Sequence, residues 1–365
     1  MKRAIKWGIA LLALVLLACE PAKQPAQQAE TALKTPIATE APTAAPTPDP
    51  TTEPTPEPTA EPTPEPTEEP TPEPTEEPTP TPAPTPFALA WLPDTQRLCA
   101  AAEADLDRLD QLGAELGARI DSDNLIGVLH SGDIVDSGSR LKQWENFRRC
   151  LNGFCDRIPF YPVAGNHDVC NTEPADGVNY VFYAKQGYVE ALPQEQRYRD
   201  GRMYYVVLNG DDAPLLLLGV GYGMGRERDQ REWIDAVMTA HADMPCILLT
   251  HAYEVRPGQV LMYCKYLEKE IVRRYANVRL VLCGHARGFF EHAELYDDDG
   301  DGTAERTVHV LMLNEQEGIF VYRVLTFDTA ARTLAVRTFR IGSDAPVDDD
   351  PVHHQPADFV LEDAF

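Results

Sequence analysis

From Phe87 to Gly284, short apolar segments alternate with longer amphipathic ones. The apolar segments are candidate strands and lie at 87–93, 125–130, 159–165, 203–209, 214–221, 246–251 and 278–284. Several are apolar at every position, as expected of strands that are buried on both faces. The segments that show helical spacing of apolar residues are 104–120, 141–152, 228–241 and 261–275. This alternation predicts an α/β layer structure.

The C-terminal part of the chain continues this domain with a different pattern. The alternation of apolar and polar residues within 304–340 predicts three antiparallel strands. Residues 346–365 are acidic and contain proline, together with His353 and His354. The sequence therefore predicts one domain at 87–345, followed by a solvent-exposed acidic tail at 346–365.

The first residues have the pattern of a signal peptide. Three basic residues precede an apolar stretch, 7–18, which is too short to span a membrane. The stretch ends in Leu-Ala-Cys at Cys19, which resembles the lipobox of bacterial lipoproteins, whose cysteine is acylated. The alternative is an ordinary secretory signal with an incidental cysteine. We expect residues 1–19 to be a lipoprotein signal, and the mature chain to be lipid-anchored outside a bacterial membrane.

Residues 20–86 have a composition that cannot build a core. Pro, Thr and Glu dominate 35–86, and the sequence PTPEPTEE occurs at 62 and again at 70. Proline fixes φ and like charges repel, so this stretch is expected to be extended, at most ~3.1 Å per residue or roughly 160 Å in all. The sequence predicts a disordered tether that is long enough to reach through a cell-wall layer.

Charge and cysteine content limit the possible partners. The formal net charge is -26, and no cluster of Lys and Arg would form a groove for nucleic acid. Without Cys19, seven of the eight cysteines remain, so at least one is unpaired unless the chain dimerises through it. Cys150 and Cys155 are the candidates for a local disulfide, whereas Cys246 and Cys283 have the surroundings of buried thiols. The oligomeric state is open.

Potential metal ligands follow the apolar segments directly: Asp94, Asp133, Asn166 with His167, His251, and His285. The carboxyl ends of strands in α/β sheets converge on one rim, where ligands collect. Each residue taken alone could be a loop cap or a hydrogen-bonded core group. Together and in this order, they predict a metal site.

The order of these motifs resembles that of the calcineurin-like metallophosphoesterases, D-x-H, G-D-x-x-D, G-N-H-(D/E), H and G-H-x-H. Here the pattern reads Asp94-Thr95-Gln96, Gly132-Asp133 with Asp136, Gly165-Asn166-His167-Asp168, His251, and Gly284-His285-Ala286-Arg287. The resemblance spans nearly the whole folded domain. The sequence is similar to a secreted or lipoprotein branch of the family, in which Gln stands at the position of the first histidine. It implies a two-sheet β-sandwich flanked by helices, with antiparallel C-terminal strands.

The resemblance also implies the chemistry. Two cations that share a carboxylate can bind a phosphate ester and turn a bridging water into hydroxide near neutral pH. Asp133 would bridge the ions, and Asn166, His251 and His285 would complete the shell of the second ion. The expected cofactors are one or two divalent ions, chosen among Mn, Fe, Zn, Mg and Ca.

The proton donor is expected next to the second ion. His167 would protonate the leaving alkoxide, and Asp168 would orient or charge its imidazole. The alternative is that His167 only braces the loop that holds Asn166.

The first ion's site departs from the family pattern twice. Gln96 is a neutral and weaker donor than imidazole, and Arg287 cannot bind a metal. With Asp94, Gln96 and Asp133 as ligands, this site is expected to bind more weakly or to prefer a harder ion. Arg287 has three interpretations: it pairs with the substrate phosphate, it takes the first ion's place beside Asp94 or Asp133, or it faces solvent while Glu291 or His292 approaches the ion.

Three further features have structural alternatives. The stretch Asp297, Asp299, Asp301 and Glu305 resembles the start of a calcium loop, but an acidic hairpin turn is the preferred interpretation. Tyr222 and Tyr253 lie beside the rim motifs and either contact substrate or pack. His130 is expected to be a structural hydrogen-bonding residue.

The predicted function is metal-dependent hydrolysis of a phosphomonoester or phosphodiester at the outer face of a bacterial membrane or cell wall. The substrate would be a phosphorylated small molecule or an envelope polymer. The alternative is a surface protein that keeps the phosphoesterase fold and binds a phosphorylated ligand with little or no turnover.

Overall fold

A computed structural model of the 365-residue chain describes residues 84–169, 186–189, 192–199, 201–209, 213–315, 320–343, 347 and 355–365. The predicted signal peptide with Cys19, and the tether up to residue 83, lie outside the described residues. Within the described ranges, we find no helix with the length and apolar character that crossing a membrane requires.

One of the two large sheets has six strands in the order β15-β14-β13-β1-β2-β3. Its strands are β1 (Phe87–Leu92), β2 (Leu125–His130), β3 (Phe160–Pro162), β13 (Val321–Asp328), β14 (Thr333–Arg340) and β15 (Phe359–Leu361). Strands β1, β2 and β3 are parallel, and β13 is antiparallel to β1. The carboxyl ends of the three parallel strands therefore share one edge.

The other large sheet has seven strands in the order β11-β12-β10-β7-β6-β5-β4. Its strands are β4 (Arg197–Tyr198), β5 (Met203–Leu208), β6 (Leu215–Val220), β7 (Cys246–Thr250), β10 (Val278–Cys283), β11 (Gly288–Tyr296) and β12 (Arg306–Asn314). The neighbours β6, β7, β10 and β12 run parallel. A small hairpin, β8 (Glu254–Arg256) and β9 (Gln259–Val260), follows β7.

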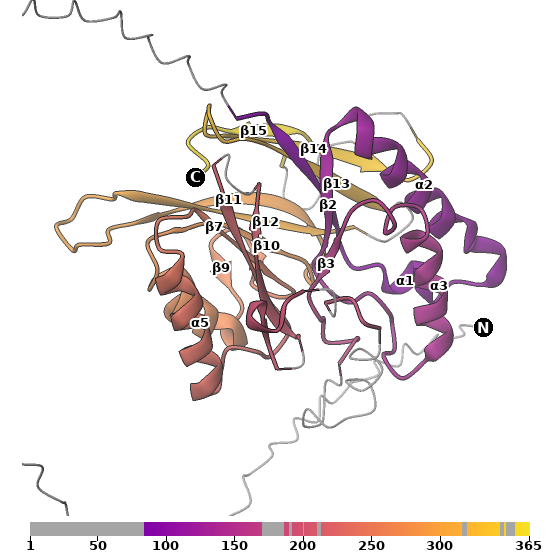
Figure 1. Ribbon diagram of the computed structural model, residues 1–365, viewed down its shortest axis with the longest axis horizontal. Coiled ribbons are helices and arrows are strands. Elements are labelled where there is room, and N and C mark those ends of the chain that lie inside the picture. The colour runs from indigo at the N-terminus through magenta and orange to yellow at the C-terminus, as the bar shows by residue number, and fades with distance from the viewer. Residues whose placement is uncertain are drawn as a thin grey trace, which may run out of the picture. The chain divides into compact units, whose positions relative to one another are not determined.

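Helices cover the outer face of each sheet (Figure 1). Against the six-stranded sheet pack α1 (Gln96–Cys99), α2 (Asp107–Ser122) and α3 (Leu141–Leu151). Against the seven-stranded sheet pack α5 (Arg228–Ala240) and a helical segment made of a 3-10 turn at Met262–Cys264, α6 (Lys265–Leu267) and a π turn at Glu268–Val272. Short 3-10 turns lie at Glu103–Asp105 and Gln194–Gln196.

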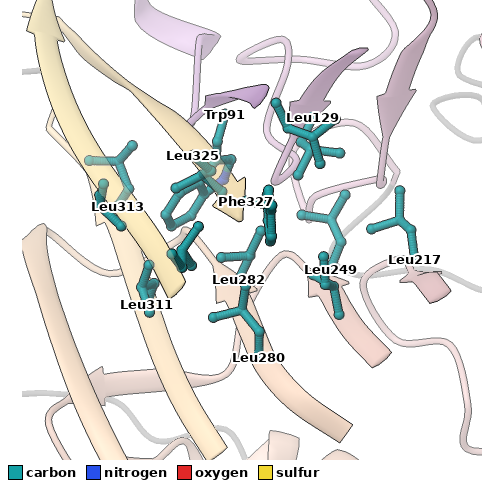
Figure 2. Packing of buried hydrophobic residues seen from close by; sticks show 14 of the residues in the cluster. Trp91, Leu129, Leu217, Leu249, Leu280, Leu282, Leu311, Leu313, Leu325 and Phe327 are labelled. Carbon is teal, nitrogen blue, oxygen red and sulfur yellow. The ribbon is translucent and has the colours of Figure 1, made fainter. Parts of the chain in front are cut away.

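The main core lies between the two sheets (Figure 2). Trp91, Leu129 and Phe327 from the first sheet belong to one cluster with Leu249 and Leu282 from the second. The alternate residues of β1 face the helices instead, so this strand is buried on both faces. The predicted α/β fold with two sheets flanked by helices is confirmed.

The C-terminal predictions need two corrections. Strand β12 does not join β13 and β14: it lies in the other sheet, antiparallel to β11 and parallel to β10. The prediction of a solvent-exposed tail at 346–365 is also wrong for its last residues, because β15 pairs with β14 and places Leu361 opposite Leu334. Leu361, Ala364 and Phe365 are buried in the core between the sheets, so their apolar area holds the last residues on the domain.

The predicted disulfide is also wrong. Cys150 is a buried free thiol and Cys155 an exposed one. Cys246 and Cys283 are buried free thiols, as predicted.

Candidate metal centre

The residues predicted as metal ligands follow strands of both sheets. Asp94 follows β1, Asp133 follows β2 and Asn166 follows β3 in the six-stranded sheet. His251 follows β7 and His285 follows β10 in the seven-stranded sheet. His251 contacts both Asp133 and Asn166, so the two sets of loops meet at one place.

Three side chains converge on His251. Its Nε2 atom lies 3.0 Å from Asn166 Oδ1, 3.1 Å from His285 Nδ1 and 3.4 Å from Asp133 Oδ2. Its other ring nitrogen, Nδ1, lies 2.8 Å from the carbonyl oxygen of Ser131 and donates a hydrogen bond to it. This bond fixes the ring so that Nε2 faces the other three groups.

The spacing of these atoms is that of ligands sharing one ion. Two atoms that each lie about 2.0–2.2 Å from a metal are roughly 3 Å apart from each other. Asp133, His251 and His285 each offer a ligand atom, and the three atoms lie within 4.8 Å of one another. Together with the amide oxygen of Asn166, this set of oxygen and imidazole donors fits a transition-metal ion such as Mn, Fe or Zn.

The two imidazoles differ in protonation. Burial alone lowers the pKa of His251, but the carboxylates of Asp133 and Asp94 outweigh it and raise that pKa to about 9. Burial, aided by the positive charge of His251, lowers the pKa of His285 to about 4. At neutral pH the metal-free protein therefore holds a proton on His251, and a divalent cation at this place would displace that proton.

The backbone is strained at two of these residues. Asp133 and His285 have φ of 52° and 68°, in the left-handed region. For residues other than glycine, such a conformation costs about 1–3 kcal/mol and is retained where surrounding contacts require it. Strain of this kind clusters at functional sites, and here it falls on two candidate ligands.

The glycines of the motifs are required by close approach. A Cβ atom on Gly165 would lie 2.2 Å from Asp133 Oδ1, and one on Gly284 would lie 2.4 Å from Asp94 Oδ1. Both distances are far below van der Waals contact. These glycines therefore let the loops of the two sheets close around the carboxylates.

Oxygen donors make up the half of the centre around Asp94. Asn314, at the end of β12, donates from Nδ2 to Asp94 Oδ2 at 2.9 Å, and the backbone N–H of His285 donates to Oδ1 at 3.3 Å. Burial raises the pKa of Asp94 well above its ordinary value, despite the positive charge of His251. Gln96 Oε1 is buried and has no hydrogen-bond partner among the described residues, which fits the predicted role of this amide oxygen as a metal ligand.

Arg287 is exposed, whereas Asp94 and Asp133 are buried. Its exposure argues against the interpretation in which its guanidinium takes the place of the first ion. The interpretation in which it faces the phosphate of a substrate is compatible with a position at the surface beside the loop of His285.

In the third interpretation, Arg287 faces solvent and Glu291 or His292 approaches the first ion. In the structure, both of these residues have other partners. Glu291 Oε1 lies 2.9 Å from His309 Nδ1. His292 lies in a separate group of side chains with Glu254 and Glu294.

His167 lies at the open side of the centre. Its backbone N–H donates to Asp133 Oδ1 at 2.8 Å, and its Nδ1 lies 2.7 Å from the carbonyl oxygen of Asp136. Its Nε2 lies 4.0 Å from Asp133 Oδ2, and about a third of its side chain is exposed. The imidazole is therefore oriented by Asp136 and presents Nε2 beside the Asp133 carboxylate.

The predicted contact between Asp168 and His167 is not made, and this prediction is corrected. The Asp168 carboxylate is fully buried and accepts hydrogen bonds from the backbone N–H groups of Gly165, Ile134 and Val135, at 2.9, 3.1 and 3.0 Å. Burial, with the charge of Asp133, raises its pKa to about 7. Asp168 joins the two loops that hold Asp133 and Asn166 and does not contact the imidazole.

The predicted substrate contact of Tyr253 is also wrong. Tyr253 is fully buried on the outer face of the seven-stranded sheet, among apolar residues. Tyr263, which the sequence analysis missed, lies at the centre instead: its hydroxyl is 2.9 Å from His285 Nε2. Tyr222 stacks edge-on against both His251 and Tyr263.

Two other predictions concern structural roles. His130 is fully buried: its Nδ1 accepts from the N–H of Gly132 at 3.1 Å, and its Nε2 lies 3.0 Å from Thr95 Oγ1, which confirms it as a structural residue. The acidic stretch forms the turn between β11 and β12, and Asp297 accepts from the backbone N–H groups of Gly300, Asp301 and Gly302.

A family model described as calcineurin-like phosphoesterase matches residues 89–286, more than half of the chain. The chain belongs to the calcineurin-like phosphoesterase family. Calcineurin-like phosphoesterases bind one or two divalent metal ions, and the donor set around His251 fits such an ion.

Two similar proteins illustrate the extent of the match to this calcineurin-like phosphoesterase. The uncharacterized protein YvnB of Bacillus subtilis (strain 168) is 28% identical over 259 residues, which are 69% of this chain and 20% of YvnB. The chain thus spans about a fifth of the length of this curated relative. The structure of purple acid phosphatase PPD1 from yellow lupin (Lupinus luteus) seeds covers 76% of this chain and 54% of its own, with a TM-score of 0.52 and 13% identity, which shows a shared fold.

Proposed function

We propose that the protein is a metal-dependent hydrolase of phosphomonoesters or phosphodiesters. The observation that supports this most strongly is the convergence of Asp133, Asn166 and His285 on Nε2 of His251, at 3.0–3.4 Å. The membership in the calcineurin-like phosphoesterase family supports the same reaction class. A divalent ion at this place would supply positive charge to the phosphate oxygens and acidify a water molecule.

The residues around the centre have separate tasks in this proposal. One ion is held by Asp133, Asn166, His251 and His285. A second ion is bound with lower affinity by Asp94, Gln96 and Asp133. His167 donates a proton from Nε2 to the leaving oxygen, because Nδ1 is fixed by Asp136 and Nε2 is accessible. Arg287 and Tyr263 contact the phosphate side of the substrate.

The test is hydrolysis of p-nitrophenyl phosphate and bis(p-nitrophenyl) phosphate by the purified full-length chain with Mn²⁺. We expect turnover that EDTA abolishes and that His251→Gln lowers strongly. His241→Gln is the matched control, because His241 lies at the end of α5 and bonds to Val237 at 2.8 Å, outside the centre. Lack of turnover of both esters with Mn²⁺, Zn²⁺, Fe²⁺, Mg²⁺ and Ca²⁺ would instead favour the non-catalytic alternative.

We also propose that the protein acts outside a bacterial membrane, where it is anchored through a lipid on Cys19 and reaches a phosphorylated small molecule or envelope polymer. The support is the sequence pattern of residues 1–19 and the Pro/Thr/Glu-rich tether. In cells, the full chain is expected to incorporate radiolabelled palmitate and to sediment with membranes. Cys19→Ser should lose the label. A soluble, unlabelled wild-type chain would contradict this proposal.

A further inference from the structure

A second group of metal-binding side chains lies outside the catalytic centre. It consists of Glu254 in β8 and of His292 and Glu294 in β11. One ligand atom from each residue lies within 4.8 Å of the ligand atoms of the other two. None of the three belongs to the motifs that define the centre around His251.

The group lies well away from the rim. Gly288, the first residue of β11, pairs with Asn314 at the rim, and β11 runs away from there. His292 is four residues further along the strand, which corresponds to about 13 Å. Its neighbours on the same face of β11, Phe290 and Tyr296, belong to the apolar cluster on the outer side of the seven-stranded sheet.

Glu254 has a buried oxygen that none of the described residues satisfies. The residue is fully buried, and its Oε2 atom accepts a hydrogen bond from the backbone N–H of Gly258 at 3.1 Å. Its Oε1 atom is buried without a hydrogen-bond partner among the described residues. Burying a carboxylate oxygen without a donor or a cation is costly, so this atom indicates a ligand.

The surroundings of Glu254 add negative charge. The Glu294 carboxylate accepts a hydrogen bond from the Tyr296 hydroxyl, and one of its oxygens lies 4.0 Å from His292 Nε2. Burial, with the charges of Glu294 and Glu268, raises the pKa of Glu254 to about 8. A cation between the two carboxylates would offset this repulsion.

Two basic residues of the neighbouring helical segment and its C-terminal end, Lys265 and Arg273, pair with a different glutamate. Lys265 Nζ lies 2.7 Å from Glu268 Oε2, and Arg273 Nη2 lies 2.7 Å from Glu268 Oε1. Glu268 therefore forms ion pairs with both Lys265 and Arg273.

We propose that Glu254, His292 and Glu294 form a second metal site, which binds a first-row divalent ion such as Zn²⁺. Two carboxylates balance the charge of the ion, and a neutral imidazole is a preferred donor for such ions. The turn between β8 and β9 already lies against the imidazole, because a Cβ on Gly258 would be 3.2 Å from His292 Nε2. The ion would link this hairpin to β11. Each of these elements begins three residues after a candidate ligand of the catalytic centre: β8 after His251, and β11 after His285.

The experiment measures Zn²⁺ bound per chain, by calorimetric titration and by elemental analysis, on the EDTA-treated full chain with Zn²⁺ alone. His292→Ala is expected to bind one ion fewer than wild type, or to bind it at least tenfold more weakly. Glu254→Gln, which preserves the shape of the side chain, is expected to do the same. Glu291→Gln is the matched control on β11, since Glu291 pairs with His309, and it should bind Zn²⁺ as wild type does.

A double variant separates this site from the catalytic centre. His251→Gln and His292→Ala should each remove a different ion, and the double variant should remove both. The proposal is overturned if His292→Ala and Glu254→Gln bind Zn²⁺ with wild-type number and affinity. It is equally overturned if the double variant binds as much Zn²⁺ as His251→Gln alone. Circular dichroism of each variant checks that the fold is retained.

Discussion

The two halves of the candidate metal centre differ in how many donors the chain provides and of what kind. In the half around His251, a second imidazole, an amide and a carboxylate lie within 3.4 Å of Nε2 of His251. In the half around Asp94, the carboxylate is held by Asn314 and by the His285 backbone, and the other donors are the shared Asp133 carboxylate and the buried oxygen of Gln96. Arg287 stands exposed where the family motif has a second histidine.

This difference indicates that the two ions have unequal affinities. A transition-metal ion gains most from imidazole, so the His251 half is expected to stay loaded at low metal concentration. The Asp94 half offers only oxygen donors and suits a harder or more weakly bound ion. The centre would then work with one firmly bound ion and one that exchanges.

The largest effect is expected from loss of an imidazole ligand. His251→Gln should lower the rate of bis(p-nitrophenyl) phosphate hydrolysis roughly 10³-fold or more, since the ion provides several kcal/mol of transition-state stabilisation. Gln96→Ala should cost only about tenfold, because a neutral oxygen donor is the weaker ligand. Rates at saturating Mn²⁺ measure both. Equal losses of rate in His251→Gln and Gln96→Ala would contradict the inference that the His251 half binds its ion more firmly than the Asp94 half.

A smaller effect, which depends on the substrate, is expected for His167→Ala. General acid catalysis is worth about 10²–10⁴-fold when the leaving group needs a proton. An alkyl phosphate ester should therefore lose roughly 10²-fold or more, and a nitrophenyl ester, whose leaving group is already a stable anion, much less. The two substrates are compared by kcat in the same variant. Equal losses would mean that His167 only braces the loop of Asn166.

The Asp94 half can be strengthened by restoring the family residues. The double variant Gln96→His/Arg287→His should bind the more weakly held ion roughly tenfold more tightly, because imidazole replaces an amide and a guanidinium. Calorimetric titration with Mn²⁺ gives both affinities. An unchanged weaker affinity would show that these two positions do not hold the ion.

The smallest expected effect is a proton linkage at His251. Its pKa is raised to about 9 in the metal-free protein, so the imidazole is protonated at pH 7.5 and must lose this proton to bind a metal. We expect release of about one proton per ion at pH 7.5, with an affinity that falls as pH falls and levels off above about pH 9. Titrations in buffers of different ionisation enthalpy measure it. No released proton would contradict the assignment of His251 as a ligand.

Much of the fold follows from local pattern. The strands around the main core were predictable because burial on both faces leaves short runs, such as 125–129, without polar residues. The candidate ligands were predictable because each one follows such a run directly. The apolar runs and the ligands that follow them are local features, so they can be recognised without knowing which strands pair.

Features that depend on pairing could not be predicted. Strands β12, β13 and β14 have similar alternation, and nothing in the alternation tells that β12 joins the other sheet. For this reason Asn314 was missed, although it ends strand β12 and lies beside Asp94, which follows β1. The terminal strand β15 was missed because it is short and lies beyond an acidic stretch.

The contacts of side chains next to the motifs were also beyond the sequence. Tyr253 is two residues from His251 but is buried on the outer face of the sheet, while Tyr263 reaches His285 from a helical turn. Asp168 follows His167 in sequence, yet its carboxylate is directed at backbone N–H groups of the neighbouring loop. Sequence distance does not give the direction of a side chain in a tight turn.

The most direct test of the account is an anomalous diffraction map from crystals of the full chain grown with a limiting amount of Mn²⁺. We predict one strong peak bounded by Asp133, Asn166, His251 and His285, and a weaker peak, or none, beside Asp94 and Gln96. A strong peak beside Asp94 and Gln96 with no density next to His251 would contradict the account.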